Sequence, residues 1–426
     1  MKKRYLLGLS IISAAFIGCG GGGSSSSSST DVLVEDGLII GAKVTDSAGH
    51  VATYKDGHYT FNTKAKLPIK VVTQNTIKDG NVSGEVKTFQ DLNKNGKYDD
   101  GDVAYNAAMS IDYSASSSDV KANPVTALIP SNWDGESEIA GLSADKVKLA
   151  STKGLDASND KTLKLTAAKL TAIQETFVKY GLKPEESDKV LEKIPADKDI
   201  VKNFDDVVKS VAQDLVDDTT LFNDDTKNLT DVSTAVSNVA TSINDLSTNT
   251  DLSSPETLVA VVQTLPEDAT EVANDTNPIT TDDLAQVDNS VFKNLVESLE
   301  LIPLSVIDPD DETIAKMDVL KVKNFKIEYI DDTHIKVVAT ATDLDDKYSF
   351  VINQTYTKDN AGAFVNKKDD NHIAKIIFDY EGGRYLVIKV DDTNIPYPLL
   401  TTDEIKNNQK LMDNKDSINS RNEAQL

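Results

Sequence analysis

The residue types best suited to chemistry gather in one acidic segment, DLNKNGKYDDGD, at residues 91–102. Its oxygen-bearing side chains recur along the segment at Asp91, Asn93, Asn95, Asp99 and Asp102. Calcium takes about six to eight oxygen ligands at roughly 2.3–2.6 Å, and a tight loop can turn alternate residues towards one ion. The segment therefore predicts a calcium site.

This spacing resembles the loop of EF-hand proteins, which is about twelve residues long. Gly96 falls where that loop turns sharply, and Lys97 would offer only its backbone carbonyl. The ligand set that the resemblance implies is Asp91, Asn93, Asn95, Lys97, Asp99 and Asp102. The last position holds aspartate instead of glutamate, which shortens the bidentate reach. We therefore expect weak binding, with a dissociation constant of about 10⁻⁴–10⁻³ M.

The segments on either side of the loop, residues 86–89 and 103–105, have the apolar and β-branched composition of strands. The loop thus resembles the calcium loops inserted in bacterial surface β-modules more than a helix-flanked sensor. A structural ion is the favoured interpretation. A metal-free acidic turn and a regulatory switch are the alternatives.

Catalytic motifs are not found in this sequence. It contains no GxSxG, HExxH, P-loop or dinucleotide-binding pattern. His50 and His58 lack the spacing of a zinc site, and His334 and His372 stand alone. We predict that the protein is not an enzyme. A hydrolase acting through paired carboxylates is a less favoured alternative.

The first residues have the pattern of an export signal. Lys2, Lys3 and Arg4 precede an apolar run over residues 5–17, which is shorter than the roughly 20 residues that span a bilayer. The run ends in FIGC at residues 16–19, which resembles the lipobox of bacterial lipoproteins. The resemblance implies cleavage after residue 18 and attachment of acyl chains such as palmitate to Cys19, the only cysteine. Phe16 stands where the family usually has leucine.

Location is predicted from the residues that follow. The family often has aspartate after the cysteine in proteins kept at the inner membrane, and Gly20 stands there instead. The resemblance therefore implies the cell envelope, at the outer membrane. Residues 19–30 form a flexible tether rich in glycine and serine.

Composition limits the partners. The formal net charge is −25, and loss of residues 1–18 with their three positive charges would make it −28. This charge disfavours nucleic acid and anionic lipid headgroups. The single cysteine leaves no disulfide for the folded part, and the single tryptophan, Trp133, weakens the case for a carbohydrate surface.

Residues 31–130 show short alternating runs separated by Gly and Asp turns, which predicts a small β-sandwich. The string IIGAKVTDSAGHVATYKDGHYTF resembles the carboxypeptidase-regulatory-like, transthyretin-like family. The matching positions are Gly41, Val44, Asp46, Gly49, Thr53, Asp56, Gly57, Tyr59 and Phe61. The resemblance implies a structural or adhesive module without catalysis.

The rest of the chain changes its periodicity twice. Single-sided apolar stripes over residues 131–300 predict a helical bundle, and Gly181 marks the end of one helix. Alternating runs over residues 301–400 predict an antiparallel β-meander, followed by a polar tail at 401–426. The predicted fold class is multidomain α+β.

Three functions fit these observations. The favoured one is a membrane-anchored structural or interaction module stabilised by one calcium ion, whose partner is an envelope protein or a polysaccharide. A second is a polysaccharide- or small-ligand-binding surface protein, which would need aromatic side chains on a concave face of the C-terminal sheet. The carboxylate-dependent hydrolase is the third.

Overall fold

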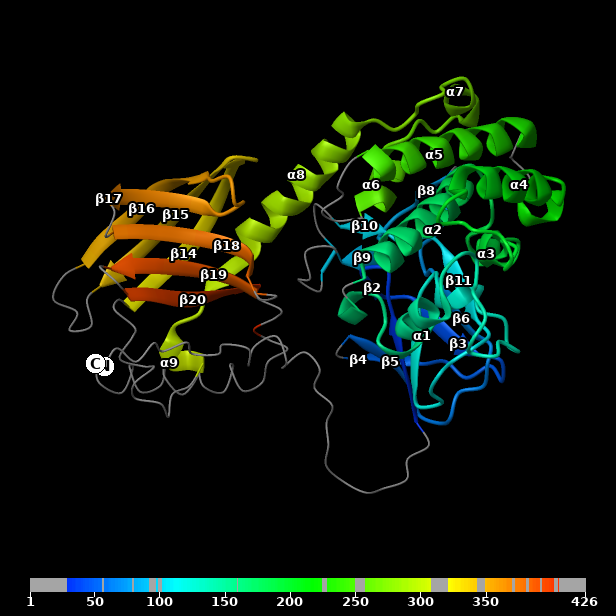
Figure 1. Ribbon diagram of the computed structural model, residues 1–426, viewed down its shortest axis with the longest axis horizontal. Coiled ribbons are helices and arrows are strands. Elements are labelled where there is room, and N and C mark those ends of the chain that lie inside the picture. The colour runs from blue at the N-terminus through cyan, green and yellow to red at the C-terminus, as the bar shows by residue number, and fades with distance from the viewer. Residues whose placement is uncertain are drawn as a thin grey trace. The chain divides into compact units, whose positions relative to one another are not determined.

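The computed structural model describes residues 29–55, 57–78, 80–91, 97–98, 102–158, 160–223, 228–249, 257–307, 321–342, 349–369, 372–380, 383–390, 393–401 and 405. These residues form two compact units, which are described separately. The N-terminal unit ends at Val291, and the C-terminal unit comprises Phe292–Leu426. Helices and strands occur in quantity, so the predicted mixed α+β class is confirmed (Figure 1).

Short strands open the N-terminal unit. They are β1 (Thr30–Val34), β2 (Leu38–Ile40), β3 (Lys43–Asp46), β4 (Thr53–Lys55), β5 (His58–Phe61), β6 (Ile69–Val72), β7 (Ile77–Lys78), β8 (Asn81–Val82), β9 (Phe89–Asp91), β10 (Val103–Ala104), β11 (Ala108–Ile111) and β12 (Asp119–Ala122). They pair as β12-β1-β5-β4, β11-β6-β3, β10-β9-β2 and β7-β8. Alternate residues of β1, β3 and β5 are buried, because successive side chains of a strand point to opposite faces.

Helices follow the strands. The α-helices are α1 (Ala144–Thr152), α2 (Lys161–Lys179), α3 (Asp188–Glu192), α4 (Phe204–Val216), α5 (Leu229–Asn249), α6 (Thr257–Gln263), α7 (Ala269–Ala273) and α8 (Thr281–Ser298), and the 3-10 turns are η1 (Thr126–Leu128), η2 (Asp156–Ser158), η3 (Pro184–Glu186) and η4 (Thr219–Leu221). Gly181 has φ +104° and follows the last residues of α2. The Leu182 N–H donates to the Phe177 carbonyl at 2.9 Å, which closes the helix as predicted.

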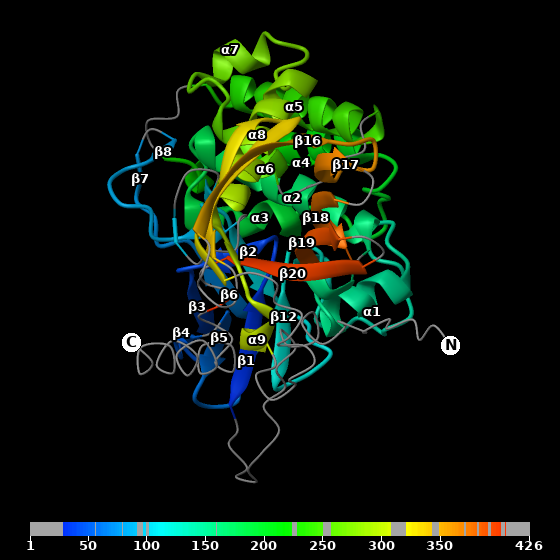
Figure 2. The same ribbon diagram turned by 90° about the vertical axis from the view of Figure 1, so that its left-hand side faces the viewer.

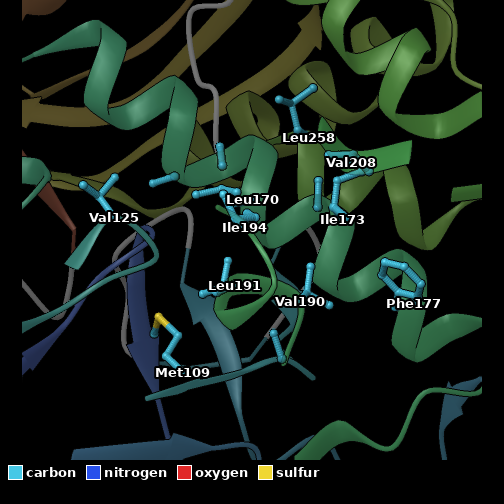
Figure 3. Packing of buried hydrophobic residues seen from close by; sticks show 14 of the residues in the cluster. Met109, Val125, Leu170, Ile173, Phe177, Val190, Leu191, Ile194, Val208 and Leu258 are labelled. Atoms are coloured by element: carbon cyan, nitrogen blue, oxygen red, sulfur yellow. The ribbon is translucent and has the colours of Figure 1, made fainter. Parts of the chain in front are cut away.

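One apolar cluster unites these strands and helices. Figure 3 shows Met109 from β11 near Leu191 from α3, with Leu170 and Ile173 from α2 and Leu258 from α6 above them. The helices also pack against one another. Helix α5 packs against α4 and α2, and α2 packs against α6. The strands and the helices share one apolar core in this unit. The free-standing helical bundle and the domain boundary near residue 130 therefore stay predictions.

The C-terminal unit is built on an eight-stranded sheet. Its strands are β13 (Leu299–Leu301), β14 (Lys321–Asp331), β15 (His334–Thr342), β16 (Ser349–Lys358), β17 (Phe364–Asp369), β18 (His372–Tyr380), β19 (Gly383–Val390) and β20 (Thr393–Thr401), and the short helix α9 (Leu304–Ile307) follows β13. Strands β14 to β20 form an antiparallel meander, as predicted, and β13 pairs with β20. The sheet curls until it is nearly closed (Figure 2).

The inner face of this sheet is apolar, and α8 fills one end of it. The ring of Phe292, on α8, lies 5.7 Å from that of Phe364 and 5.1 Å from that of Phe378. Val296, on the next turn, is fully buried in the same cluster. Within the part of the chain that the structure describes, no helix has the length and apolar character needed to cross a membrane.

Gly41 offers a test of the N-terminal packing. It has φ +76°, and a Cβ there would collide with the Lys87 carbonyl oxygen, whereas Gly49 has φ +85° and open space around it. We expect Gly49→Ala to lower the free energy of unfolding by about 1–2 kcal/mol, the cost of the left-handed backbone. Gly41→Ala should lower the free energy of unfolding by clearly more, because its Cβ would add a collision with the Lys87 carbonyl oxygen to the same backbone strain.

The measurement is denaturant unfolding followed by tryptophan fluorescence. Trp133 is the only tryptophan of the chain and is buried in the N-terminal unit, so it reports on that unit. Equal losses in the two variants would contradict the close approach of Gly41 to the Lys87 carbonyl.

Candidate functional site

The predicted calcium loop connects the two strands of a hairpin. β9 and β10 pair antiparallel, with Gln90 opposite Val103. Asp91 is the last residue of β9 and Asp102 immediately precedes β10, so the first and last predicted ligands lie where the chain leaves the ladder and returns to it. This arrangement confirms that strands flank both ends of the loop.

Burial differs among the predicted ligands. The Asp91 residue is 1% exposed, and Asp102 is half-buried. A buried carboxylate is costly unless hydrogen bonds or positive charge offset its lost hydration. The ring of Tyr98, within the loop, packs against Phe89 at the start of β9 with 5.6 Å between centroids. Tyr98 therefore lies beside β9.

The predicted ligand set is only partly described. Asn93, Asn95 and Asp99 lie outside the described residues, and Lys97 is exposed. Among the residues that the structure does describe, no group of three or more His, Cys, Asp or Glu side chains is placed to hold a metal ion. The donor chemistry still fits calcium, because Asp91 and Asp102 present hard carboxylate oxygens from the two ends of one loop.

Asn75 holds the base of the hairpin together. Its Oδ1 accepts the N–H groups of Lys87 at 2.7 Å and Thr88 at 2.9 Å, just before β9. Its Nδ2 donates to the carbonyls of Thr88 at 2.7 Å and Tyr105 at 3.1 Å, the latter just after β10. The Tyr105 N–H also donates to the Thr88 carbonyl at 3.0 Å. One amide side chain thus bonds to the backbone on both sides of the loop.

Glu175 connects this base to helix α2. Its carboxylate accepts the backbone N–H groups of Asn106 at 2.6 Å and Ala107 at 2.9 Å, and the Asn106 Nδ2 at 3.1 Å. The neighbouring Gln174 donates to the Ala108 carbonyl at 2.7 Å. The chain that leaves the hairpin is therefore bonded to two successive polar side chains of α2.

Burial shifts the acidity of this region. It raises the pKa of Glu175 from 4.5 to about 7, although the three hydrogen bonds to Asn106 and Ala107 act in the opposite direction. The pKa of Tyr105 is raised well above its ordinary value, first by complete burial and then by the nearby Asp36 and Glu175 carboxylates. The base of the hairpin is therefore a polar patch that is shielded from water.

Three of the four histidines, His58, His334 and His372, are the first residues of strands, and His50 follows the turn after β3. His50 Nδ1 is 2.9 Å from Asp46 Oδ2, and His334 Nδ1 is 2.9 Å from Asp331 Oδ1. Both contacts are local, four and three residues apart. His58 is exposed, and the side chain of His372 lies outside the described residues. Cys19, the predicted lipidation site, also lies outside them.

Sequence reasoning missed Asn75, Asn106 and Glu175. Asn75 sits in an ordinary polar stretch between strands, where nothing distinguishes it from a surface residue. Glu175 gave one signal in the sequence, because it lies between the apolar residues Ile173 and Phe177. The helix buries every residue from Thr166 to Lys179. An acidic residue in such a helix must find hydrogen-bond donors.

Comparisons with known protein families, curated proteins and solved structures give no match for this chain.

Glu175 should make stability depend on pH. Its pKa is higher in the folded state, about 7 against 4.5, so its stabilising contribution is complete below pH 4.5 and is lost as pH rises through 7. We expect the free energy of unfolding of Glu175→Gln, measured by Trp133 fluorescence, to lack a decrease of about 2–3 kcal/mol that the natural chain shows over that window.

Glu185→Gln is the matched control, because Glu185 is exposed in the same region. It should keep the pH profile of the natural chain. An unchanged profile in Glu175→Gln would show that the buried carboxylate keeps the same pKa in the folded and unfolded states.

Proposed function

We propose that this protein is an exported, lipid-anchored structural or interaction module without catalytic activity, stabilised by one calcium ion in the β9–β10 loop. The observation that carries the proposal is the hairpin that places Asp91 and Asp102 at the two ends of the loop, with Asp91 buried. The alternating oxygen donors between them supply the rest of the ligand set, as the sequence predicts.

Calcium at this position would act on the whole N-terminal unit. The ion would draw together the acidic residues of a chain whose formal net charge is −25. The base of the hairpin is bonded through Asn75 to both strands and through Glu175 to α2. An ion bound in the loop would therefore stabilise a segment that is already attached to α2, which favours a structural role over that of a free-standing sensor.

Anchoring and location rest on the sequence. The lipobox-like FIGC and the tether that follows support attachment by acyl chains at Cys19 and an envelope location at the outer membrane. The binding partner in this proposal is another envelope component, either a protein or a polysaccharide. The chain's acidic charge disfavours nucleic acid.

The burial of aromatic side chains in the C-terminal sheet weighs against the polysaccharide-binding alternative. It needs several aromatic side chains on an accessible face of the C-terminal sheet. Tyr356 and Tyr385 are buried, and Phe378 packs against the ring of Phe292. Tyr348 and the side chain of Phe350 lie outside the described residues. An aromatic platform for sugar rings is therefore not favoured among the strands that the structure describes.

Calcium titration tests the proposal. We expect residues 29–426 to bind about one calcium ion by calorimetry. With a dissociation constant of about 10⁻⁴–10⁻³ M, 10 mM calcium should raise the free energy of unfolding by about 1.4–2.7 kcal/mol. Trp133 fluorescence should report the increase, because the tryptophan and the hairpin belong to one unit.

Asp91→Ala and Asp102→Ala should both abolish the heat of binding and the stabilisation. Asp197→Ala, which removes an exposed carboxylate elsewhere in the same unit, should leave both unchanged. No heat and no stabilisation at 10 mM calcium would reduce the loop to an acidic turn. Equal effects of all three variants would indicate general screening of charge instead of a site.

A further inference from the structure

The C-terminal sheet contains a cavity of about 440 Å³ on its inner face. That volume lies in the range of about 300–1,000 Å³ that is typical of small-molecule sites. The cavity is lined by Leu301, Val322, Phe325, Val337, Val351, Ile352, Gln354, Tyr356, Ala374, Leu386, Ile388 and Tyr397. These residues come from β13, β14, β15, β16, β18, β19 and β20, so the cavity lies inside the curl of the sheet.

The two ends of the curl differ. Phe292 of α8 packs among Phe364, Phe378 and Tyr329, near the last residues of β14 and β18 and the first of β17. The cavity lies towards the other end, beside Val322 at the start of β14 and Ile388 at the end of β19. Helix α8 therefore fills one end of the interior, and the space remains at the opposite end.

The lining determines what the cavity can accept. It contains no lysine, arginine, aspartate or glutamate, and its polar groups are the Gln354 amide and the hydroxyls of Tyr356 and Tyr397. An ionised group carried into such a site would lose its hydration without a counter-charge. The lining therefore suits an uncharged apolar molecule that has at most a hydroxyl or an ester at one end.

The shape favours a chain over a compact ring system. Ile352, Gln354 and Tyr356 are alternate residues of β16, so they lie on one face of the strand, and all three line the cavity. Five residues of a strand extend over roughly 13 Å between the first and the last. Val351, which also borders the cavity, is 71% exposed, so the cavity is open to solvent beside the start of β16.

We infer that the C-terminal sheet binds the alkyl chain of an uncharged single-chain lipid, such as a fatty alcohol or a monoacylglycerol, inside this cavity. The chain lies along β16 and takes the place of water against aliphatic side chains. The hydroxyl end lies at the open end of the curl. This binding needs none of the predicted calcium ligands, and the strands β9 and β10 belong to the other unit.

Probe displacement tests the inference. Residues 29–426, which contain every described residue, are titrated with N-phenyl-1-naphthylamine, whose fluorescence rises in apolar sites. The bound probe is then displaced with n-alkanols from octanol to tetradecanol, below their solubility limits. Each buried methylene should improve affinity about fourfold until the cavity is full. Dodecanol should displace the probe better than sodium dodecanoate, because the cavity offers no counter-charge.

Variants locate the site. Ala374→Phe projects a ring into the cavity and should abolish binding, whereas Asn353→Phe adds a ring on the exposed outer face of β16 and should not. Ala374→Val is a milder insertion and should shift the longest chain bound towards shorter alkanols. Far-ultraviolet circular dichroism checks that each variant keeps its sheet.

Three results would overturn the inference. One is a lack of dependence on chain length, and another is stronger displacement by dodecanoate than by dodecanol. The third is full binding by a folded Ala374→Phe variant. None of these bears on calcium binding by the β9–β10 loop, so each proposal can fail alone.

Discussion

The N-terminal unit depends on a carboxylate that lies where water cannot reach it. Glu175 joins α2 to the chain leaving the β9–β10 hairpin through bonds to Asn106 and Ala107. Buried polar groups cost free energy when their partners are lost, so this contact specifies one relation of helix to hairpin. The chain has a single cysteine and therefore cannot achieve the same fixation by an internal disulfide. Hydrogen bonds and one shared apolar core hold the helix and the hairpin together instead of a disulfide.

The two units fill their interiors in different ways. In the N-terminal unit the side chains of strands and helices interdigitate, as Met109 and Leu191 illustrate (Figure 3). In the C-terminal unit the rings around Phe292 fill one end of the curled sheet, and small residues such as Ala374 leave space at the other. Dense packing serves a scaffold, whereas unfilled apolar space suits reversible binding. The contrast agrees with a stabilising role for the first unit and a receptive role for the second.

Strong periodicity was the reliable guide from sequence. Helices are found within residues 131–300, where the apolar stripes predict them, and Gly181 ends α2 as expected, because both follow from local geometry. Strand β20 falls in the region predicted as a meander, although Pro396 and Pro398 have no N–H to donate to a ladder. It forms nonetheless, with its proline positions paired to Val387 and Tyr385 of β19. The hydrogen bonds of Asn75 at the base of the hairpin and the cavity in the C-terminal sheet were not predicted, because both depend on residues that only the complete fold brings together.

The place of β13 in the C-terminal sheet has a consequence for biogenesis. β13 precedes the meander in the chain, yet it pairs with β20, the last strand: Leu299 lies opposite Thr401. The sheet cannot complete its curl until β20 has been made, since contacts so distant along the chain form late. Before that moment both β13 and β19 present open edges, which are sites of aggregation. Under the proposed export, threading through a membrane in extended form would spare the chain this interval inside the cell.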